Sequence, residues 1–329
     1  MRRARRPLIR LVLGTVATAA FLWLFLREVD LGEAWGEIRG LPPFTVAGAI
    51  GLVLVNVAVM AVRWRYLLEG AGYRVPLRSL FSSVAVGRGA NNVVPARGGD
   101  LLRIESMREV AGVPAFVSAG TLFAERLLDG VVLAAWILIG ALAVGNGGIP
   151  LLTGIALSAG TALGVVLVTL AARRPAGAQR VAARAARRLP ARWHDRAVDA
   201  ASHFVEGLGA FRGQRQLAFV LGTSILMWLV DVAMFVLVGH AYDLDLELGA
   251  YFLLEGIGNL ALAVPATAAG LGSFDYLTYL AARDIEISER DATAYVLTMH
   301  ALLVLPVTLL GALLLPPALP RLFRRGSAA

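Results

Sequence analysis

The sequence predicts an all-α integral membrane protein with about six full spans plus two broken re-entrant segments of inverted topology. Of its 329 residues, 58% are hydrophobic, and the mean hydropathy is +0.70, which exceeds the apolar share of a typical soluble domain. Several apolar runs reach the roughly 20 residues that a helix needs to cross a bilayer. Because no soluble domain of useful size stands between them, we interpret residues 1–329 as one transmembrane domain.

The first two spans are oriented by the charges at their ends, since arginine is enriched in cytoplasmic loops. An arginine-rich stretch, 1–6, precedes an apolar run over 8–26 that is too long for the h-region of a signal peptide and has no small-residue cleavage site after it. An acidic loop, 27–43, follows and is expected outside. The second run, 44–62, returns to a basic loop that begins with Arg63. We therefore expect a cytoplasmic N-terminus and place Arg63 in a cytoplasmic loop.

Four further apolar runs complete the expected spans, at 113–144, 151–172, 217–239 and 293–315. The second of these runs is followed by Arg173 and Arg174, so it is expected to end inside, and the last is followed by arginines as well. The sequence thus predicts a multi-pass protein of the cell (inner or cytoplasmic) membrane with a cytoplasmic C-terminus.

The largest polar block, 173–216, holds eight arginines between residues 173 and 196. Its apolar residues recur at three- or four-residue spacing, which places them on one helical face. These residues are Trp193, Ala197, Ala201, Phe204, Leu208 and Phe211. The pattern predicts a cytoplasmic basic amphipathic helix on the inner leaflet. A helix packed against other cytoplasmic loops is an equally supported alternative.

The first broken segment, 88–103, contains Asn91, Asn92, Pro95 and a glycine pair. Proline removes a backbone donor and glycine releases the chain from helical geometry, so backbone groups are freed that only protein or trapped water can satisfy at membrane depth. The loop before it is basic, and the turn at Gly145, after the next apolar run, is expected outside. The segment is therefore expected to enter and leave on the cytoplasmic side. A cytoplasmic turn between two helices is the alternative.

The second broken segment, 251–283, repeats the order Asn, Pro, Gly, Gly, Asp with different spacing and has acidic flanks, so it is expected to open outward. Paired breaks in the two halves of a chain indicate a transporter with inverted repeats and a midplane site. The expected hinge residues are Pro95, Gly98, Gly99, Pro265, Gly270 and Gly272.

Three charges, Glu125, Arg126 and Asp129, interrupt the apolar run at 113–144. Each costs about 2.5–3.5 kcal/mol at a helix centre, and their spacing lets them share one face. A structural ion pair between helices is one interpretation. The other is a phosphate headgroup site, since the planar fork of arginine suits phosphate. The candidate headgroup-binding residues are Arg88, Asn91, Asn92, Arg97, Asp100, Arg103, Glu125, Arg126 and Asp129.

Three more ionisable residues, Asp231, Glu255 and His300, fall inside expected membrane segments. Such groups often form proton relays, although for His300 alone the pattern favours a satisfied histidine of the core.

Several kinds of chemistry are excluded or unsupported. The chain has no cysteine and no lysine, which excludes disulfides, thiolate metal sites and Schiff bases. We find no metal-ligand spacing, nucleotide fingerprint or Gly-x-Ser-x-Gly elbow, and so expect no metal, cofactor or catalytic residue. The net charge of +8 indicates anionic lipid surfaces before nucleic acid.

The motifs Arg63-Trp64-Arg65, Pro-Ala-Arg-Gly-Gly-Asp-Leu-Leu-Arg from Pro95, Glu125-Arg126-Leu-Leu-Asp129 and Gly-Leu-Gly-Ser-Phe after Pro265 resemble the lysylphosphatidylglycerol synthase transmembrane family. That family is also described as flippase-like, and the resemblance covers roughly residues 10–320. It implies a membrane half that moves an aminoacylated phospholipid across the bilayer, while a separate soluble domain makes that lipid. Since the chain ends at Ala329, it resembles the flippase half alone.

The function predicted from the sequence is lipid translocation between leaflets, through a polar cavity between two broken helices, by a protein that is not itself an enzyme. The expected partners are membrane lipids with a phosphate-bearing headgroup and a possible lipid-synthesising enzyme, with no nucleic acid. Two alternatives stay open. One is a non-transporting scaffold that anchors a separately encoded lipid-modifying enzyme through 173–216. The other is a membrane enzyme acting on a lipid phosphate, with Glu125 or Asp129 as acid or base.

Overall fold

The computed structural model describes residue 23 and residues 31–94, 98–145, 148–187, 190–262 and 268–315. All regular elements in these ranges are helices. Five of them are long and apolar enough to cross a membrane: α3 (Pro43–Gly70), α6 (Ala115–Ala143), α7 (Ile149–Arg173), α10 (Gln214–Ala241) and α13 (Glu289–Leu314). They confirm a multi-pass, all-α membrane protein. The sixth expected span, 8–26, lies outside the described residues.

Helix α3 is longer than predicted. It starts at Pro43, where the missing N–H of proline costs nothing, and it continues to Gly70. Trp64, Leu67 and Leu68 extend its apolar face and are completely buried. The assignment of Arg63 to a cytoplasmic loop was therefore wrong, because this arginine lies within the helix with no exposed surface.

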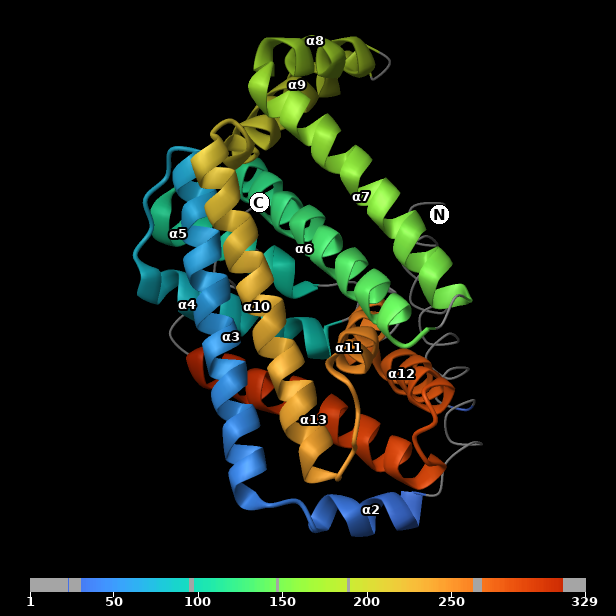
Figure 1. Cartoon of the computed structure of the whole chain (residues 1–329). Coiled ribbons are helices and arrows are strands. Elements are labelled where there is room, and N and C mark those ends of the chain that lie inside the picture. The colour runs from blue at the N-terminus through green and yellow to red at the C-terminus, as the bar shows by residue number, and fades with distance from the viewer. Residues whose placement is uncertain are drawn as a thin grey trace, which may run out of the picture.

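Each predicted broken segment is a pair of short helices that pack against each other. The first pair is α4 (Leu77–Val93) with α5 (Gly98–Ala111), and the second is α11 (Leu248–Leu262) with α12 (Ser273–Asp284). A short 3-10 turn, η3 (Ala268–Gly270), precedes α12. In Figure 1 α12 lies beside α13, and α4 lies beside α3. We call α4 with α5 the first hairpin and α11 with α12 the second hairpin. That either hairpin enters the membrane stays a prediction.

The glycines of the two breaks have different roles. In the second break Ala269, Gly270 and Gly272 have φ of 55°, 76° and 80°, so the chain turns there through the left-handed region that glycine tolerates. In the first pair, Gly98 and Gly99 lie in the first turn of α5, and a Cβ on Gly99 would meet the backbone carbonyl of Gly87 on α4. Gly99 thus allows the two helices to approach. Pro95 and Pro265 lie outside the described residues.

Helix α13 contacts both hairpins, because it packs against α4 and against α12. The Asn92 amide of α4 donates to the Val304 carbonyl at 3.4 Å and to Thr308 Oγ1 at 2.8 Å. Pro306 lies inside the helix between these two acceptors, and its ring removes one helical hydrogen bond. The first hairpin is therefore hydrogen bonded to α13 next to the position where that helix lacks one backbone hydrogen bond.

The basic block is two helices, α8 (Pro175–Ala186) and α9 (Ala191–Gly207), followed by a short turn, η2 (Gly209–Phe211). They form the upper end of the molecule in Figure 1, opposite α2 (Leu31–Arg39). The expected apolar face is divided. Phe204 packs on Phe123 of α6 with ring centroids 5.6 Å apart, and Leu208 and Phe211 are buried. Trp193 remains 45% exposed at the other end of α9.

Candidate functional site

The polar interior is centred on Arg63 of α3. Its Nη1 contacts Asp129 Oδ1 of α6 at 2.5 Å and donates to Ser224 Oγ of α10 at 3.0 Å, and its Nη2 lies 3.5 Å from Glu125 Oε1. The Trp228 indole of α10 also donates to Asp129 Oδ1, at 3.2 Å. A completely buried guanidinium requires such counter-charges. This cluster joins the three long helices α3, α6 and α10.

A second ion pair attaches the first hairpin to this cluster. Arg103 of α5 donates from Nη1 and Nη2 to the two oxygens of Glu125, at 2.9 and 3.0 Å, and both side chains are buried. The guanidinium also lies over the ring of Trp64 at 4.2 Å, and the Trp64 indole donates to Thr121 Oγ1 at 3.0 Å. With both carboxylate oxygens bound in parallel, this is the strongest geometry available to arginine.

Arg126 is held more loosely. Its Nη2 lies 3.3 and 3.4 Å from the two oxygens of Asp100 on α5, and its Nη1 lies 3.7 Å from Asp129. The side chain is 38% exposed, while its Nε is buried and has no partner among the described residues. Asn91 of α4 donates to Asp100 at 3.3 Å, and its own Oδ1 also lacks a described partner. This corner of the network is accessible and has unused donors and acceptors.

Arg88 of α4 has neutral partners. Its Nη1 donates to Asn56 Oδ1 at 2.8 Å and lies 3.1 Å from Met60 Sδ, both on α3. The Asn56 amide nitrogen in turn donates to Asp231 Oδ1 of α10 at 2.7 Å and to the Met227 carbonyl. Within the described ranges no carboxylate lies within 4 Å of Arg88. An amide thus separates this half-buried cation from the nearest acid in the hydrogen-bond chain.

Glu255 of α11 is completely buried. Its Oε1 accepts from Asn259 Nδ2, one helical turn away, at 2.9 Å, and its Oε2 has no partner among the described residues. This carboxyl lies in the second hairpin and is not bonded to the arginine network.

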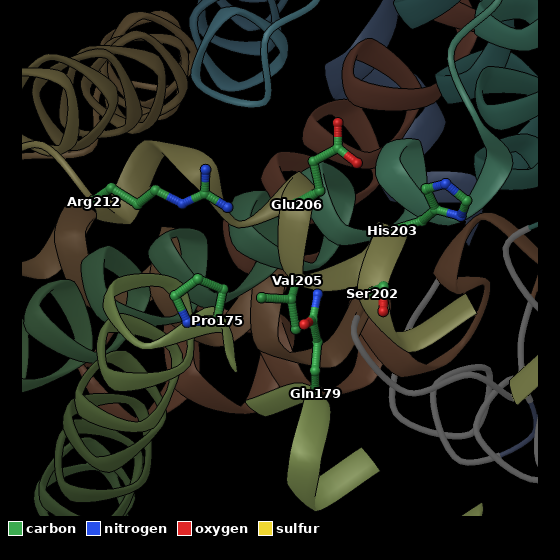
Figure 2. A pocket seen from close by; sticks show the side chains of 7 residues that line it. All are labelled: Pro175, Gln179, Ser202, His203, Val205, Glu206 and Arg212. Carbon is green, nitrogen blue, oxygen red and sulfur yellow. The ribbon is translucent and has the colours of Figure 1, made fainter. Parts of the chain in front are cut away.

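A cavity of about 300 Å³ lies where α8 and α9 meet the segment after η2 (Figure 2). It is lined by Pro175, Gln179, Ser202, His203, Val205, Glu206 and Arg212. Arg212 Nε donates to the Ala172 carbonyl at 3.2 Å. Burial raises the pKa of Tyr73 above its usual value, and so does the Glu206 carboxylate, to which the Tyr73 hydroxyl is hydrogen bonded. The predicted transport cavity between the two hairpins is not this one.

The structure brings most of the candidate residues together. One connected network contains Asn91, Asp100, Arg103, Glu125, Arg126 and Asp129. Arg88 belongs to a neighbouring chain of contacts through Asn56, and Asn92 is directed instead toward α13. Arg97 lies outside the described residues. Among the predicted headgroup contacts, Arg103 is bound by both oxygens of Glu125 at 2.9–3.0 Å, Arg126 has longer contacts to two carboxylates, and Arg88 has none within 4 Å among the described residues.

Sequence reasoning missed the partners supplied by the long helices: Asn56, Arg63, Ser224 and Trp228. A signal for Arg63 was present, since Leu67 and Leu68 repeat the apolar spacing beyond it and so extend the span. For Ser224 no such signal existed. Its partner Arg63 is 161 positions away, and no local pattern reports such a contact.

Comparison with known proteins gives consistent results. The family described as Lysylphosphatidylglycerol synthase TM region matches residues 8–311. Glycosyltransferase AglD of Haloferax volcanii is 27% identical over 298 residues, which cover 81% of this chain and 47% of that protein. A UPF0104 membrane protein of Methanothermobacter thermautotrophicus is 24% identical over 286 residues, 80% of each chain. The chain thus spans about half the length of the first relative and most of the second.

Proposed function

Because the chain belongs to the Lysylphosphatidylglycerol synthase TM region family, we propose that this membrane protein moves a phosphate-bearing lipid between the leaflets of the bilayer. The headgroup passes along the polar network that joins the first hairpin to α3, α6 and α10, while the acyl chains stay in the membrane. The observation that carries this proposal is a pair of arginines. Arg88 has no carboxylate within 4 Å among the described residues, and Arg126 is partly exposed and holds Asp100 and Asp129 only at 3.3–3.7 Å.

Arg88 supplies the first argument. The half-buried guanidinium of Arg88 contacts an amide oxygen and a thioether, and the acid in its hydrogen-bond chain, Asp231, lies beyond Asn56, so no carboxylate contacts it directly among the described residues. Arg63 and Arg103, by contrast, each have a carboxylate oxygen within 3 Å. An anionic headgroup next to Arg88 would therefore complete a charge balance that the other two arginines already have.

Arg126 supplies the second argument. Its contacts to Asp100 are 3.3–3.4 Å long, compared with the 2.9–3.0 Å of Arg103 to Glu125, and its side chain is partly exposed. A phosphate offers oxygens in the arrangement that a guanidinium binds with two parallel bonds. Exchange of Asp100 for a lipid phosphate would release α5 from α6 at one of its two ion pairs. Binding and hinge movement are thereby connected.

The proposal is tested with purified protein in liposomes that contain a fluorescent phosphatidylglycerol, whose transfer is followed by quenching with dithionite outside. Arg88→Gln and Arg126→Gln are expected to lower the transfer rate more than tenfold. Arg108→Gln on α5, an exposed arginine that pairs with Glu105, is the matched control and should transfer normally. Unchanged transfer in both interior variants would overturn the assignment.

A scaffold function is the second candidate, supported by one comparison. The Haloferax relative bears the name glycosyltransferase and is about twice as long as the region that this chain matches. The membrane part of such a protein can serve to hold an enzyme. In that case purified protein would transfer no lipid, and replacing the arginines of α8 would impair function in cells while Arg88→Gln would not. Lipid turnover by the purified protein would instead revive the enzyme alternative.

A further inference from the structure

His300, near the middle of α13, contacts the second hairpin through both ring nitrogens. Its Nδ1 lies 2.6 Å from Asp275 Oδ1 on α12, and its Nε2 lies 3.0 Å from the Ala269 carbonyl in η3. The other Asp275 oxygen accepts the Gly272 N–H at 2.8 Å. His300 and Asp275 are 7% and 3% exposed, so water contributes little to these contacts. Two side chains therefore hold the break, the start of α12 and α13 together.

The contacts fix the number of protons in this pair. A carbonyl oxygen only accepts, so Nε2 must carry a hydrogen toward Ala269. The 2.6 Å contact on the other side also needs a hydrogen between Nδ1 and the carboxylate. The pair is therefore either imidazolium with carboxylate or imidazole with carboxylic acid. Both forms contain one proton more than a neutral imidazole beside an ionised Asp275.

Loss of that proton would break one of the two contacts that His300 makes with the second hairpin. A neutral imidazole has a single N–H, so it can donate to Asp275 or to Ala269 but not to both, and either tautomer leaves one ring nitrogen facing an acceptor, at 2.6 or 3.0 Å. The break is already strained, because Ala269 has a φ of 55°, in a region that is costly for a residue with a Cβ. Release of His300 removes the contact that holds the Ala269 carbonyl in place. The hairpin would then be free to move relative to α13.

We propose that the His300–Asp275 pair is the binding site of a coupling proton, whose release allows the second hairpin to leave α13 during lipid translocation. The step is a simple dissociation: the protonated pair gives a neutral His300, an ionised Asp275 and one proton. This inference rests on the proposed translocation and adds the ion that drives it. Helix α13 also contacts Asn92 of the first hairpin, so a movement of α13 that follows proton release would act on the first hairpin as well.

The surroundings of the pair are otherwise poor in compensating charge. Of the described residues, Asp275 is the one acid within 4 Å of the imidazole. The charged groups on the other helices packed against α13 include Arg88 on α4, Arg63 on α3, Asp231 on α10 and Glu37 on α2, which binds Arg290. The Phe274 ring lies against His300, with ring centroids 5.0 Å apart. The proton is therefore shared between two groups and not delocalised over a larger network.

The decisive variant is Asp275→Asn. Its amide nitrogen can donate to His300 Nδ1 and its oxygen can accept from Gly272, so both contacts persist without the shared proton. Asp291→Asn is the matched control, because Asp291 lies at the start of α13 and its carboxylate bonds Ser288 instead of His300. Proteoliposomes with fluorescent phosphatidylglycerol are given a one-unit pH difference in either direction. The initial rates of lipid transfer are then compared with and without a protonophore.

Wild type and Asp291→Asn are expected to transfer lipid at least threefold faster in one gradient direction than in the other, and the protonophore should remove the difference. Asp275→Asn should show equal rates in both directions. Equal rates in wild type would overturn the coupling and leave translocation intact. A second measurement needs no lipid transfer: in detergent, wild type should release one proton more per chain than Asp275→Asn as the pH rises from 5 to 9. Equal proton release by the two proteins would overturn the inference. This outcome is independent of lipid transfer, so it can be told apart from a failure of the proposed function.

Discussion

Arg88 and Asp231 bind the same amide from opposite sides: Asn56 accepts from Arg88 at 2.8 Å and donates to Asp231 at 2.7 Å. A cation of α4 and an acid of α10 are thus linked through α3 without contacting each other. Because the amide carries no net charge, Arg88 keeps its positive charge available for a ligand. The buried Arg103–Glu125 pair has no such reserve.

Supplying a counter-charge to Arg88 should block lipid transfer. Met60 Sδ lies 3.1 Å from Arg88 Nη1, and glutamate has a similar length, so Met60→Glu should form an ion pair with Arg88. We expect the transfer rate to fall more than tenfold, since the headgroup would compete with a covalently attached carboxylate. Met60→Leu removes the sulfur without adding charge and should transfer normally. If Met60→Glu retained full transfer, Arg88 would not contact the headgroup.

Breaking the Arg103–Glu125 pair should destabilise the fold. Arg103→Met leaves Glu125 buried with only the longer contact to Arg63, and removal of one partner from a buried pair costs about 3–5 kcal/mol. The loss is measured by thermal unfolding in detergent. Arg65→Ala removes a half-exposed pair with Glu69 and should cost at most about 1 kcal/mol. An Arg103→Met variant as stable as Arg65→Ala would contradict the structural role of the pair.

Gly99→Ala should disrupt the first hairpin. The added methyl group would collide with three atoms of α4: the carbonyl oxygen of Gly87 and the backbone nitrogen and Oδ1 of Asn91. We expect a lower yield of folded protein, detected by size-exclusion chromatography, because α4 and α5 must separate. Gly51→Ala in α3 meets no atom within 4 Å and is the control. Equal behaviour of the two variants would mean that α4 and α5 do not cross at Gly99.

Ala269→Gly should relieve strain in the second break. An L-residue at φ 55° costs about 1–3 kcal/mol where its surroundings hold it there, and glycine removes that cost. We expect higher thermal stability and a smaller destabilisation by His300→Gln than in the wild-type background. A double-mutant cycle measures this coupling. Strict additivity would show that His300 does not hold the strained residue.

The two ends of the molecule should face opposite sides of the membrane. Since the chain has no cysteine, Trp193→Cys on α9 and Trp35→Cys on α2 each give a single reactive thiol at an exposed position. In cells, an impermeant maleimide is expected to label Trp35→Cys, while Trp193→Cys should react only after permeabilisation. Labelling of both from one side would reject the topology that the arginine distribution predicts.

Much of the fold could be predicted because its signals are local. The run predicted at 113–144 is α6 at 115–143, with Pro114 directly before it, and the breaks lie where glycine and proline interrupt apolar sequence. The same reasoning failed at Arg63. The charge rule assumes that an arginine near the end of an apolar run has reached water, but Glu125 and Asp129 neutralise this one inside the protein. Whether a charge is buried depends on partners that sequence spacing does not identify.

The partners in the candidate site illustrate the same limit. The candidate list contained the three acids Asp100, Glu125 and Asp129 and most of the arginines, because charges in apolar runs are conspicuous. It could not assign Arg103 to Glu125 or Arg126 to Asp100, since those pairs form only after α5 folds back beside α6. His300 looked like an ordinary core histidine, and it is nearly buried. Its contact with a strained turn became visible only in three dimensions.

The position of α13 has a consequence for the electrical insulation of the membrane. One helix holds the first hairpin through Asn92 and the second through His300, with Pro306 between His300 and Thr308. In the translocation proposed above, a tilt of α13 that loosens one hairpin would press on the other. The two halves would then open in turn, and the headgroup would cross without a continuous water-filled path through which ions would leak.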